Sequence, residues 1–458
     1  MLDRNVDLKE LNKEELIELV NLLLGRVSTL EKQVAELKSE GKKSVKKTSR
    51  NSSIPPSRDQ KSNITKKQKA KRGPKCGHQG NSRRRTKADE IIECRVTACE
   101  QCGMDLSQNR QWLVGRHQVI DVPPVRPIVS EARRYRTTCP HCHHQQTADY
   151  VTGFERGRVF GRHLEQMVLY LHYAHPLSYE RVQRIVLELF GLKITQGALV
   201  NMVKRAQPAL TCAAAAIHQQ IKQSVVIGSD ETTARIDGTK YWQWVFQTPD
   251  YAYYVIRPSR AAQVIADVMG DAQPQVWVSD VFSSQMCHPA QHYQICLAHQ
   301  VRDLQYAIDT HQCHWAQQVQ TVFEDAMHLH RQRDQFTATD FACQRDDYEA
   351  TLDTLLQVVP DNIDSETLRG RYTKHRSALL LFLHRHDVPP TNNASERALR
   401  NSVIYRKVTG GFRTDWGAEL YADLVSVLET ARRQGRSIFE TLSALLAGHD
   451  AFSVSHSL

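Results

Sequence analysis

Apolar runs long enough to cross a membrane are missing from this 458-residue sequence. An uninterrupted apolar stretch such as Ala378 to Leu383 is far shorter than the roughly 18 residues that a membrane span requires. The first ten residues, MLDRNVDLKE, contain no basic segment leading into an apolar one, so no signal peptide is predicted. Repeats of constant period are also lacking. We therefore expect a cytoplasmic protein without a membrane partner, built from several domains of about 150 residues.

Acidic residues are almost missing from one segment. Between Gly41 and Lys87, seventeen Lys or Arg accompany a single acid, Asp59, so this segment carries +16 while the whole chain carries +10. Its polar, Ser- and Pro-containing composition cannot bury a core and predicts disorder until something anionic binds. A solvated linker is the simpler interpretation. A DNA arm is the functional one, because phosphate contacts release counterions and make affinity fall with salt.

Disulfides are not expected, because cysteines in an unexported chain should be reduced. The eleven cysteines include two CxxC pairs, Cys99 with Cys102 in ACEQCG and Cys139 with Cys142 in TCPHCHH. Two such pairs predict a tetrahedral four-thiolate zinc site, although the gap of 36 residues between them is longer than usual. Strand-like alternation within the gap is consistent with a zinc ribbon. Possible substitute ligands are Cys94, His141 and His143.

The N-terminus carries a heptad pattern of alternating steps of four and three. Its apolar positions are Leu16, Val20, Leu23, Val27, Leu30, Val34 and Leu37. Valine at position a with leucine at position d favours a two-stranded parallel coiled coil. A single amphipathic helix docked on the rest of the protein is the alternative. We therefore expect a homodimer or a higher oligomer.

Two helices around a glycine turn are predicted further along the chain. They cover Tyr179 to Phe190 and Gly197 to Ala206, separated by GLKITQ. This spacing is compatible with a DNA-reading helix-turn-helix. Many plain helical hairpins share it, and both interpretations stay open.

Strand-like sequence begins near Gln223. SVVIGSDETTARIDG and QVWVSDVFSS flank a helical stretch at Ala261 to Met269, which predicts β runs joined by a crossover helix. Asp230 and Asp280 each end an apolar β run, and they would meet at one sheet edge if the strands are neighbours. An aspartate at a strand end is commonly a turn former. Glu231 should point to the opposite side of the strand from Asp230.

A polar, His-rich helical stretch from His311 to about His386 reads as an insertion. It is followed by PPTNNASERALRNSVIYRK, in which Asn393 and Glu396 have the spacing of a capping box that would begin a helix. In this interpretation Arg400 is only a helical salt-bridge partner of Glu396.

Taken together, these motifs resemble a known family. The order of the zipper, SRNSSIPPSRD, GHQG, the paired CxxC motifs, GSDETTARIDG, WQWVF, VSDVFSS, CLAHQVRDL and NNASERALR is similar to that of transposases of the insertion sequence 66 type. The resemblance covers nearly the whole chain. It implies an Asp-Asp-Glu transposase that cleaves the ends of a mobile element and joins the freed 3′-hydroxyl to target DNA.

The resemblance also implies a catalytic core of the ribonuclease H fold. Asp230, Asp280 and Glu396 match the three acids that hold Mg²⁺ or Mn²⁺ for two-metal-ion phosphoryl transfer. The implied partners are double-stranded DNA, as element ends and target, and accessory proteins from the same element. Cations expected to bind DNA phosphates are Arg397, Arg400, Arg406 and Lys407, for which a plain charged surface is the alternative.

The predicted fold is therefore multidomain. The expected parts are a coiled coil (1–40), a basic linker (41–88), a zinc ribbon (89–152), a helical, helix-turn-helix-like region (153–222), an α/β ribonuclease H-like core (223–310 and 387–432), a helical insertion (311–386) and a C-terminal tail (433–458). Two other functions are consistent with the same sequence. One is a nuclease of this fold without strand transfer, and the other is a non-catalytic DNA-binding regulator with a zinc ribbon and a zipper. A transposase would be expected at the nucleoid.

Overall fold

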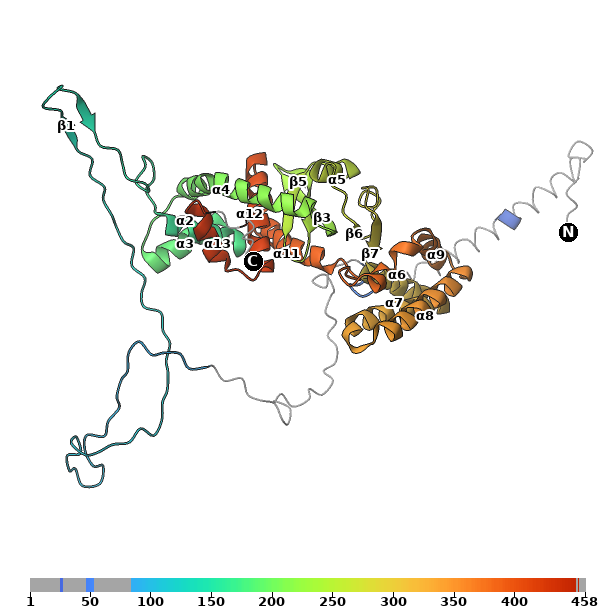
Figure 1. The fold of residues 1–458 in the computed structure, drawn as a ribbon, viewed down its shortest axis with the longest axis horizontal. Coiled ribbons are helices and arrows are strands. Elements are labelled where there is room, and N and C mark those ends of the chain that lie inside the picture. Colours follow the sequence, from blue (N-terminus) through green and yellow to red (C-terminus); the bar gives the residue numbers. More distant parts are fainter. Residues whose placement is uncertain (1–24, 28–46, 53–83, 450–451, 453–458) are drawn as a thin grey trace, which may run out of the picture. The chain divides into compact units, whose positions relative to one another are not determined.

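The computed structural model describes residues 25–27, 47–52, 84–449 and 452 (Figure 1). Apart from 25–27, the predicted zipper over 1–40 lies outside these residues, and so does most of the predicted linker over 41–88. The described residues form two compact units, one with 134–184 and 194–449 and the other with 84–133 and 185–193. The predicted domain boundaries stay predictions.

A five-stranded mixed sheet forms the centre of the first unit, in the order β5-β4-β3-β6-β7. Its strands are β3 (Val226–Ile236), β4 (Thr239–Gln247), β5 (Ala252–Arg257), β6 (Val276–Ser279) and β7 (His292–Ile295). Strands β3, β4 and β5 pair antiparallel, whereas β6 pairs parallel with both β3 and β7. The crossover from β5 to β6 contains helix α5 (Ala262–Met269). The predicted α/β character of this region is therefore confirmed.

Strand β3 is longer than the sequence suggested. Two residues, Asp237 and Gly238, join it to β4, and both have positive φ values of 46° and 75°. This is the signature of a type I′ hairpin turn, whose twist matches that of the paired strands. Pairing therefore continues from the turn back to Gly228. The expectation that the β run ends at Asp230 was wrong, because the strand passes through this residue and runs on to Ile236.

The two faces of the sheet have different apolar cover. Helix α5 packs on the face that carries Ile227 and Trp244. The opposite face, with Val245 and Tyr254, packs on helices that follow much later in the sequence. These are α11 (Asn393–Thr409) and α12 (Asp415–Arg433), drawn in orange and red beside the green strands in Figure 1. The alternation of side chains along each strand therefore separates two layers of helices.

Helix α12 also covers the edge of the sheet. Strand β5 is an edge strand, and its Tyr254 amide donates to Ser426 Oγ at 2.9 Å. The amide of Ala252 donates to Thr430 Oγ1 at 3.1 Å. An uncovered edge exposes a row of such groups to other chains. Two hydroxyl side chains of α12 therefore satisfy outward backbone groups of β5.

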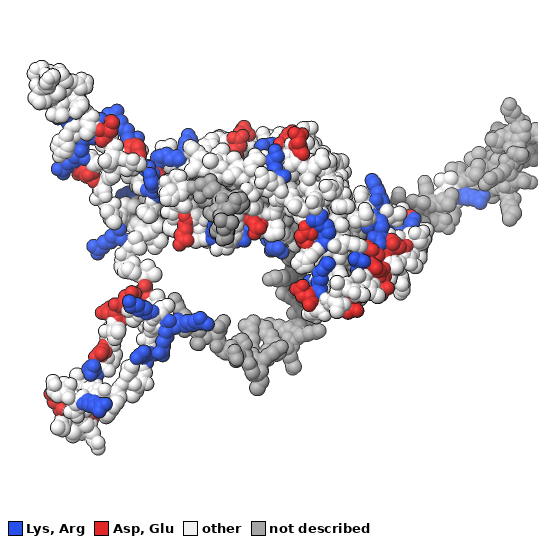
Figure 2. All heavy atoms as spheres, viewed as in Figure 1, with Lys and Arg blue, Asp and Glu red and all other residues white. Residues whose placement is uncertain are grey.

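A second apolar core lies among the helices that follow β7. They are α6 (Leu297–His311), α7 (His314–Arg331), α8 (Ala338–Gln357), α9 (Ile363–Lys374) and α10 (Leu381–His384). Their buried residues form one cluster with Val276 and Val278 of β6. Figure 2 shows basic and acidic side chains interspersed over this helical part. Its surface is therefore not of one charge.

Helices before and after the sheet pack together in the same unit. They are α2 (Arg162–Leu169), α4 (Gln196–Lys222) and α13 (Ile438–Leu446). Helix α3 (Tyr179–Phe190) begins in this unit, and its residues from Ile185 on belong to the other unit. Helix α3 has the predicted bounds, whereas α4 extends far beyond the predicted end at Ala206. Helix α13 packs against α2 and α4, within the segment predicted as a C-terminal tail.

A small antiparallel ribbon consists of β1 (Arg136–Thr138) and β2 (Gln145–Thr147). Short helical segments are η2 (Tyr170–Ala174), η3 (Arg333–Gln335) and η4 (Arg376–Ala378). No helix among the described residues combines the length and the apolar character that crossing a bilayer requires.

Candidate active site

Two aspartates lie level with each other on neighbouring strands. The register of β3 and β6 pairs Gly228 with Val278, two residues before Asp230 and Asp280 respectively. Asp280 directly follows Ser279, the last residue of β6. Since the two strands are parallel, both aspartates come to the same level of the sheet. The condition on which the sequence argument depended, that the two strands are neighbours, is met.

The side chains next to Asp230 face the opposite side of β3. Ser229 Oγ donates to Gln285 Oε1 at 2.8 Å, and Gln285 in turn donates to Glu231. Glu231 also forms a salt bridge with Arg260, and only 1% of its side chain is exposed. Because Ser229 and Glu231 share this buried face, Asp230 lies on the face covered by α11, as the alternation predicted.

The first turn of α11 is fastened to β3 through Asn392. The Asn392 side-chain amide donates to the Ser229 carbonyl at 2.6 Å, and its Oδ1 accepts from Ser395 Oγ at 2.6 Å. The Asn392 backbone amide donates to Cys296 Sγ at 3.0 Å. These three contacts connect β3, the start of α6 and the start of α11. They fix the helix that carries Glu396 against the strand that carries Asp230.

Gly228 makes this close approach possible. A Cβ built on Gly228 would lie 2.2 Å from Gln247 Nε2 and 3.1 Å from both Asn392 Oδ1 and Ser395 Oγ. The absence of a side chain therefore lets α11 sit directly on the strand.

We expect Gly228→Ala to lower the free energy of unfolding by about 1–3 kcal/mol, because the added methyl group overpacks this contact. The matched control is Gly370→Ala in α9, where a Cβ would meet nothing within 4 Å. An alanine inside a helix should be neutral or stabilising by up to about 1 kcal/mol. Urea unfolding of both variants tests this. Equal stabilities would contradict the proposed role of Gly228.

Glu396 does not act as a capping-box residue. Helix α11 begins at Asn393 with Asn392 as its N-cap, so Glu396 is one position too far along to reach back to the cap. Its Oε1 instead lies 3.3 Å from His299 Nε2 and 3.3 Å from Arg302 Nη2, both on α6. The local interpretation of this residue was wrong. The expected start of the helix at Asn392 or Asn393 is confirmed.

Asp230 is influenced by the charges of the other two acids. Its pKa is raised well above the usual value, first by burial, then by the charges of Glu231 and Asp280, and also by Glu396. Within the described part of the chain, no three His, Cys, Asp or Glu side chains already form a metal cage. The donor set nevertheless fits a hard divalent cation, since it consists of carboxylate oxygens in an environment of excess negative charge.

This raised pKa predicts that Asp230 destabilises the fold at neutral pH. The folded state holds the carboxyl proton more tightly than the unfolded state, so stability contributed by this group rises as pH falls through the folded-state pKa. We expect Asp230→Asn to raise the Tm at pH 7, by about 2–4 °C for each kcal/mol by which the free energy of unfolding increases. The advantage over wild type should shrink as pH falls. Thermal unfolding beside Asp271→Asn, an exposed control, measures both effects, and an unchanged or lower Tm would contradict them.

The predicted DNA-contacting cations of α11 divide into two groups. Arg397, Arg400 and Lys407 are exposed. Arg406 is half-buried, donates to Thr233 Oγ1 at 3.1 Å and has a pKa lowered by burial. Arg406 is therefore engaged with β3, whereas the other three are accessible to solvent.

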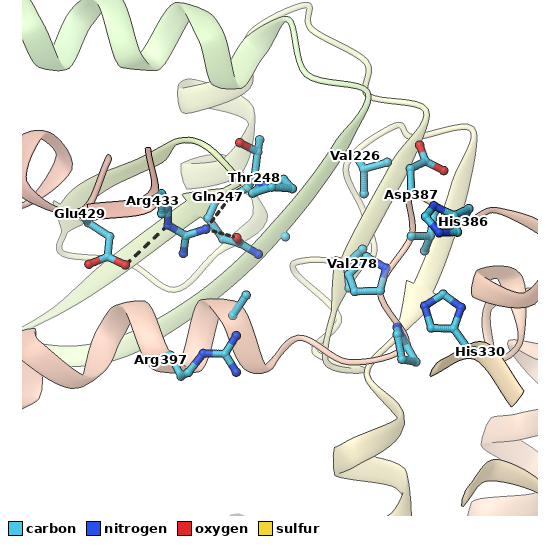
Figure 3. A pocket seen from close by; sticks show the side chains of 16 residues that line it. Val226, Gln247, Thr248, Val278, His330, His386, Asp387, Arg397, Glu429 and Arg433 are labelled. Carbon is cyan, nitrogen blue, oxygen red and sulfur yellow. Dashed lines mark hydrogen bonds and ion pairs between the residues drawn. The ribbon is translucent and has the colours of Figure 1, made fainter. Parts of the chain in front are cut away.

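A cavity of about 530 Å³ is lined by residues of the strands that carry the two aspartates, and Figure 3 shows its lining side chains. Gly228 and Val278 line it, each two residues before an aspartate, and Arg397 lines it from α11. The Arg433 side chain, which also lines the cavity, donates a hydrogen bond to Gln247 Oε1 at 2.7 Å and forms an ion pair with Glu429. None of the three acids lines this cavity. Arg397 therefore faces a different space from Glu396, its neighbour in sequence.

Each CxxC pair forms the same compact turn. The amide of Gly103 donates to the Cys99 carbonyl, and that of His143 donates to the Cys139 carbonyl, both at 2.9 Å. Gly103 and His143 both have positive φ. Hydrogen bonds from the backbone of Cys102 and of Cys142 lower the pKa values of Cys99 and Cys139. Each turn therefore favours the thiolate form that metals bind.

Sequence reasoning missed the residues that position the acids. Asn392, Arg302 and Gln285 make contacts between elements that are distant in the sequence, so local patterns give no signal for Asn392 or Gln285. His299 and Arg302 do show one signal, because residues three apart share a helix face. That spacing in CLAHQVRDL could have indicated a paired contact.

Comparison with known proteins identifies the family. The model of the Transposase IS66 family matches residues 157–420, more than half of the chain. This chain is a member of the IS66 transposase family. The region of this chain that matches the IS66 transposases includes both aspartates, Glu396 and helix α6, which carries His299 and Arg302. The resemblance predicted from the sequence motifs is confirmed.

One curated relative is similar over a shorter region. It is the uncharacterized protein y4jO of Sinorhizobium fredii (strain NBRC 101917 / NGR234), which is 32% identical over 79 residues. The match covers 17% of this IS66-family chain and 25% of the relative. The chain therefore spans about a quarter of the length of that protein.

Proposed function

We propose that this protein is a DNA transposase that cleaves the ends of a mobile element and joins the freed 3′-hydroxyl to target DNA. The observation that carries the proposal is the arrangement of the acids. Asp230 and Asp280 lie level on neighbouring parallel strands, and Glu396 lies on a helix fastened to the first of them. An antiparallel meander followed by two parallel strands supports a ribonuclease H-like core.

In this proposal Asp230, Asp280 and Glu396 would hold two Mg²⁺ or Mn²⁺ ions. Two such ions stabilise the charge on the attacking and leaving oxygens of an in-line displacement. Water attacks the phosphorus at the element end and the 3′-oxygen leaves as a hydroxyl. That hydroxyl then attacks a target phosphorus and displaces the 3′-oxygen of the target strand. No covalent protein intermediate is required.

The neighbouring residues then have defined tasks. Arg302 and His299 hold Glu396 Oε1 through contacts at 3.3 Å, which restricts its rotamers. Asn392 fixes the helix, and the Arg260 salt bridge compensates the charge of Glu231 on the opposite face. Well-positioned ligands are needed because small displacements are costly in catalysis.

DNA binding in this proposal is shared among several parts. Arg397, Arg400 and Lys407 contact phosphates of double-stranded DNA, as does the basic segment over 41–88. The zipper over 1–40 makes the protein a dimer or higher oligomer, and proteins from the same element assist it. The protein would act at the nucleoid.

The test is incubation of the purified protein with supercoiled plasmid, labelled element ends and Mg²⁺ or Mn²⁺. Nicking and joined products support a transposase. Metal-dependent nicking without joining would favour a nuclease of the same fold. DNA binding without nicking would favour the non-catalytic regulator.

We also propose that Cys99, Cys102, Cys139 and Cys142 bind one Zn²⁺. The lowered pKa values of the leading cysteine of each pair support thiolate ligation. We expect metal analysis of the full chain to find about one zinc per chain. Cys102→Ser should lose most of it, while the control Cys343→Ser, which changes an exposed cysteine outside the pairs, should keep it. Equal zinc content in both variants would contradict the assignment.

A further inference from the structure

Four arginines and two glutamates gather around a second cavity. It has a volume of about 350 Å³ and lies between the start of α2, the loop before it, α4 and the end of α13. Its charged lining residues are Glu155, Arg156, Arg158, Arg162, Glu165 and Arg205. None of the three acids lines this cavity.

Glu165 is the buried brace of this cluster, because only 2% of its side chain is exposed. Its Oε2 accepts from Arg158 Nη2 and its Oε1 from Arg205 Nη2, both at 2.6 Å. Two guanidinium groups are thereby held in fixed orientations on α4 and on the loop before α2. Planar guanidinium groups fixed in this way are suited to bind phosphate oxygens.

Glu155, in the loop before α2, also pairs with Arg158. It accepts from the Gly153 amide at 2.7 Å and from Arg158 Nη1 at 3.3 Å. The Gly153 amide and, to a smaller extent, Arg158 lower the pKa of Glu155 to about 2, so it is ionised at neutral pH. The two glutamates therefore compensate the charges of Arg158 and Arg205.

Two arginines of the cavity stay uncompensated. Arg156 and Arg162 are exposed, and among the described residues neither has an ion-pair or hydrogen-bond partner for its side chain. Arg162 is also the first residue of α2, whose N-cap Gly161 supplies no side-chain hydrogen bond. The positive end of the helix dipole adds to the charge of the arginines. The lining therefore has a net charge of +2 and an opening to solvent.

We propose that this cavity binds a phosphate of the DNA backbone. The inference rests on the proposed function, since it assigns the cavity to the same DNA that the acids would cut. Arg156 and Arg162 contact the phosphate from the rim, and the braced Arg158 and Arg205 supply the fixed charges behind them. Arg205 lies on α4, the second helix of the predicted helix-turn-helix pair. A phosphate contact here fixes the position and orientation of the duplex without reading its sequence.

The test compares two double variants of the full chain. Arg156→Gln/Arg162→Gln removes the two exposed charges of the rim. Arg331→Gln/Lys374→Gln removes two exposed charges from α7 and α9 and is the matched control. Affinity for a duplex of arbitrary sequence is measured from low to high KCl, and nicking of supercoiled plasmid is measured at saturating protein. Unchanged Tm values check the fold.

In a plot of log K against log[salt], the affinity of a DNA-binding protein falls more steeply when more phosphates are contacted. For the rim variant we expect this slope to be shallower by about 0.9 for each phosphate contact removed. Its affinity at low salt should fall about tenfold, while the control keeps wild-type values. Equal slopes in the rim variant and wild type would overturn the inference, and so would equal losses in the rim variant and the control.

The two proposals fail in different ways. In one outcome the wild-type protein neither nicks nor joins DNA, but the salt dependence of DNA affinity is still weaker in the rim variant. The phosphate site is then supported and the proposed catalysis is contradicted. If nicking is intact and the slope does not change, the catalysis stands and the phosphate site fails. Protection of the wild type by inorganic phosphate in a thermal unfolding assay, without any effect of the rim variant on DNA affinity, would assign the cavity to a free anion and overturn the DNA contact.

Discussion

Glu396→Gln should abolish strand cleavage and leave DNA binding intact. The substitution keeps the size of the side chain and its hydrogen bonds from Arg302, but it removes one negative charge from a three-carboxylate site. A loss of about 4 kcal/mol of transition-state stabilisation corresponds to a rate roughly a thousandfold lower. DNA affinity should survive because the substitution removes none of the cations of α11, and the basic segment and the arginine cavity lie elsewhere in the chain. Cleavage rate, DNA affinity and Tm are the measurements.

The chain offers matched controls for this experiment. Glu419 and Glu429 lie on the next helix, α12; Glu419 is exposed, and Glu429 is paired with Arg433 beside the larger cavity. We expect Glu419→Gln and Glu429→Gln to cleave at near-normal rates, and Asp280→Asn to be as inactive as Glu396→Gln. Near-normal cleavage by Glu396→Gln, together with loss of activity in one of the two controls, would move the third acid to α12.

Glu165→Gln should cost about 3 kcal/mol of unfolding free energy. Removing one partner of a buried ion pair typically costs about 3–5 kcal/mol, because the remaining charge stays buried without compensation. We expect the low end, since 33% of the Arg205 side chain is exposed and water can reach it. Arg158, at 13% exposure, has less access to water. Urea unfolding is the measurement.

Glu180→Gln is the control for burial. Like Glu165, Glu180 forms an ion pair with an arginine. Its partner, Arg184, lies on the same helix, and 74% of the Glu180 side chain is exposed. Exposed pairs contribute about 0–1 kcal/mol, so this variant should unfold almost as wild type does. A similar cost for both variants would show that Glu165 is not a buried brace.

The strands around the acids were predictable because their signals are local. The apolar β runs before Asp230 and Asp280 and the helix after Asn392 depend on residues that are adjacent in the sequence. The level placement of the two aspartates also followed, once their strands were taken as neighbours. The extension of β3 past Asp230 was missed because SDETTAR is polar, although it pairs with β4 throughout.

The support of the site was not predictable in the same way. Asn392 binds the Ser229 carbonyl and the Cys296 thiol across long sequence separations, and nothing near Asn392 indicates these partners. From the sequence, either Asn392 or Asn393 could be the N-cap of this helix. Because the N-cap is Asn392, Glu396 lies one residue beyond the position that a capping box requires. Tertiary contacts, rather than local propensity, selected Asn392 and turned Glu396 toward α6.

The cover on strand β5 limits how copies of this chain could associate. Ser426 and Thr430 occupy the Tyr254 and Ala252 amides that an added strand would need. Extension of the sheet from one molecule into another at this edge would require α12 to lift away and expose its buried side chains. We therefore expect copies of this chain to associate through surfaces other than the β5 edge.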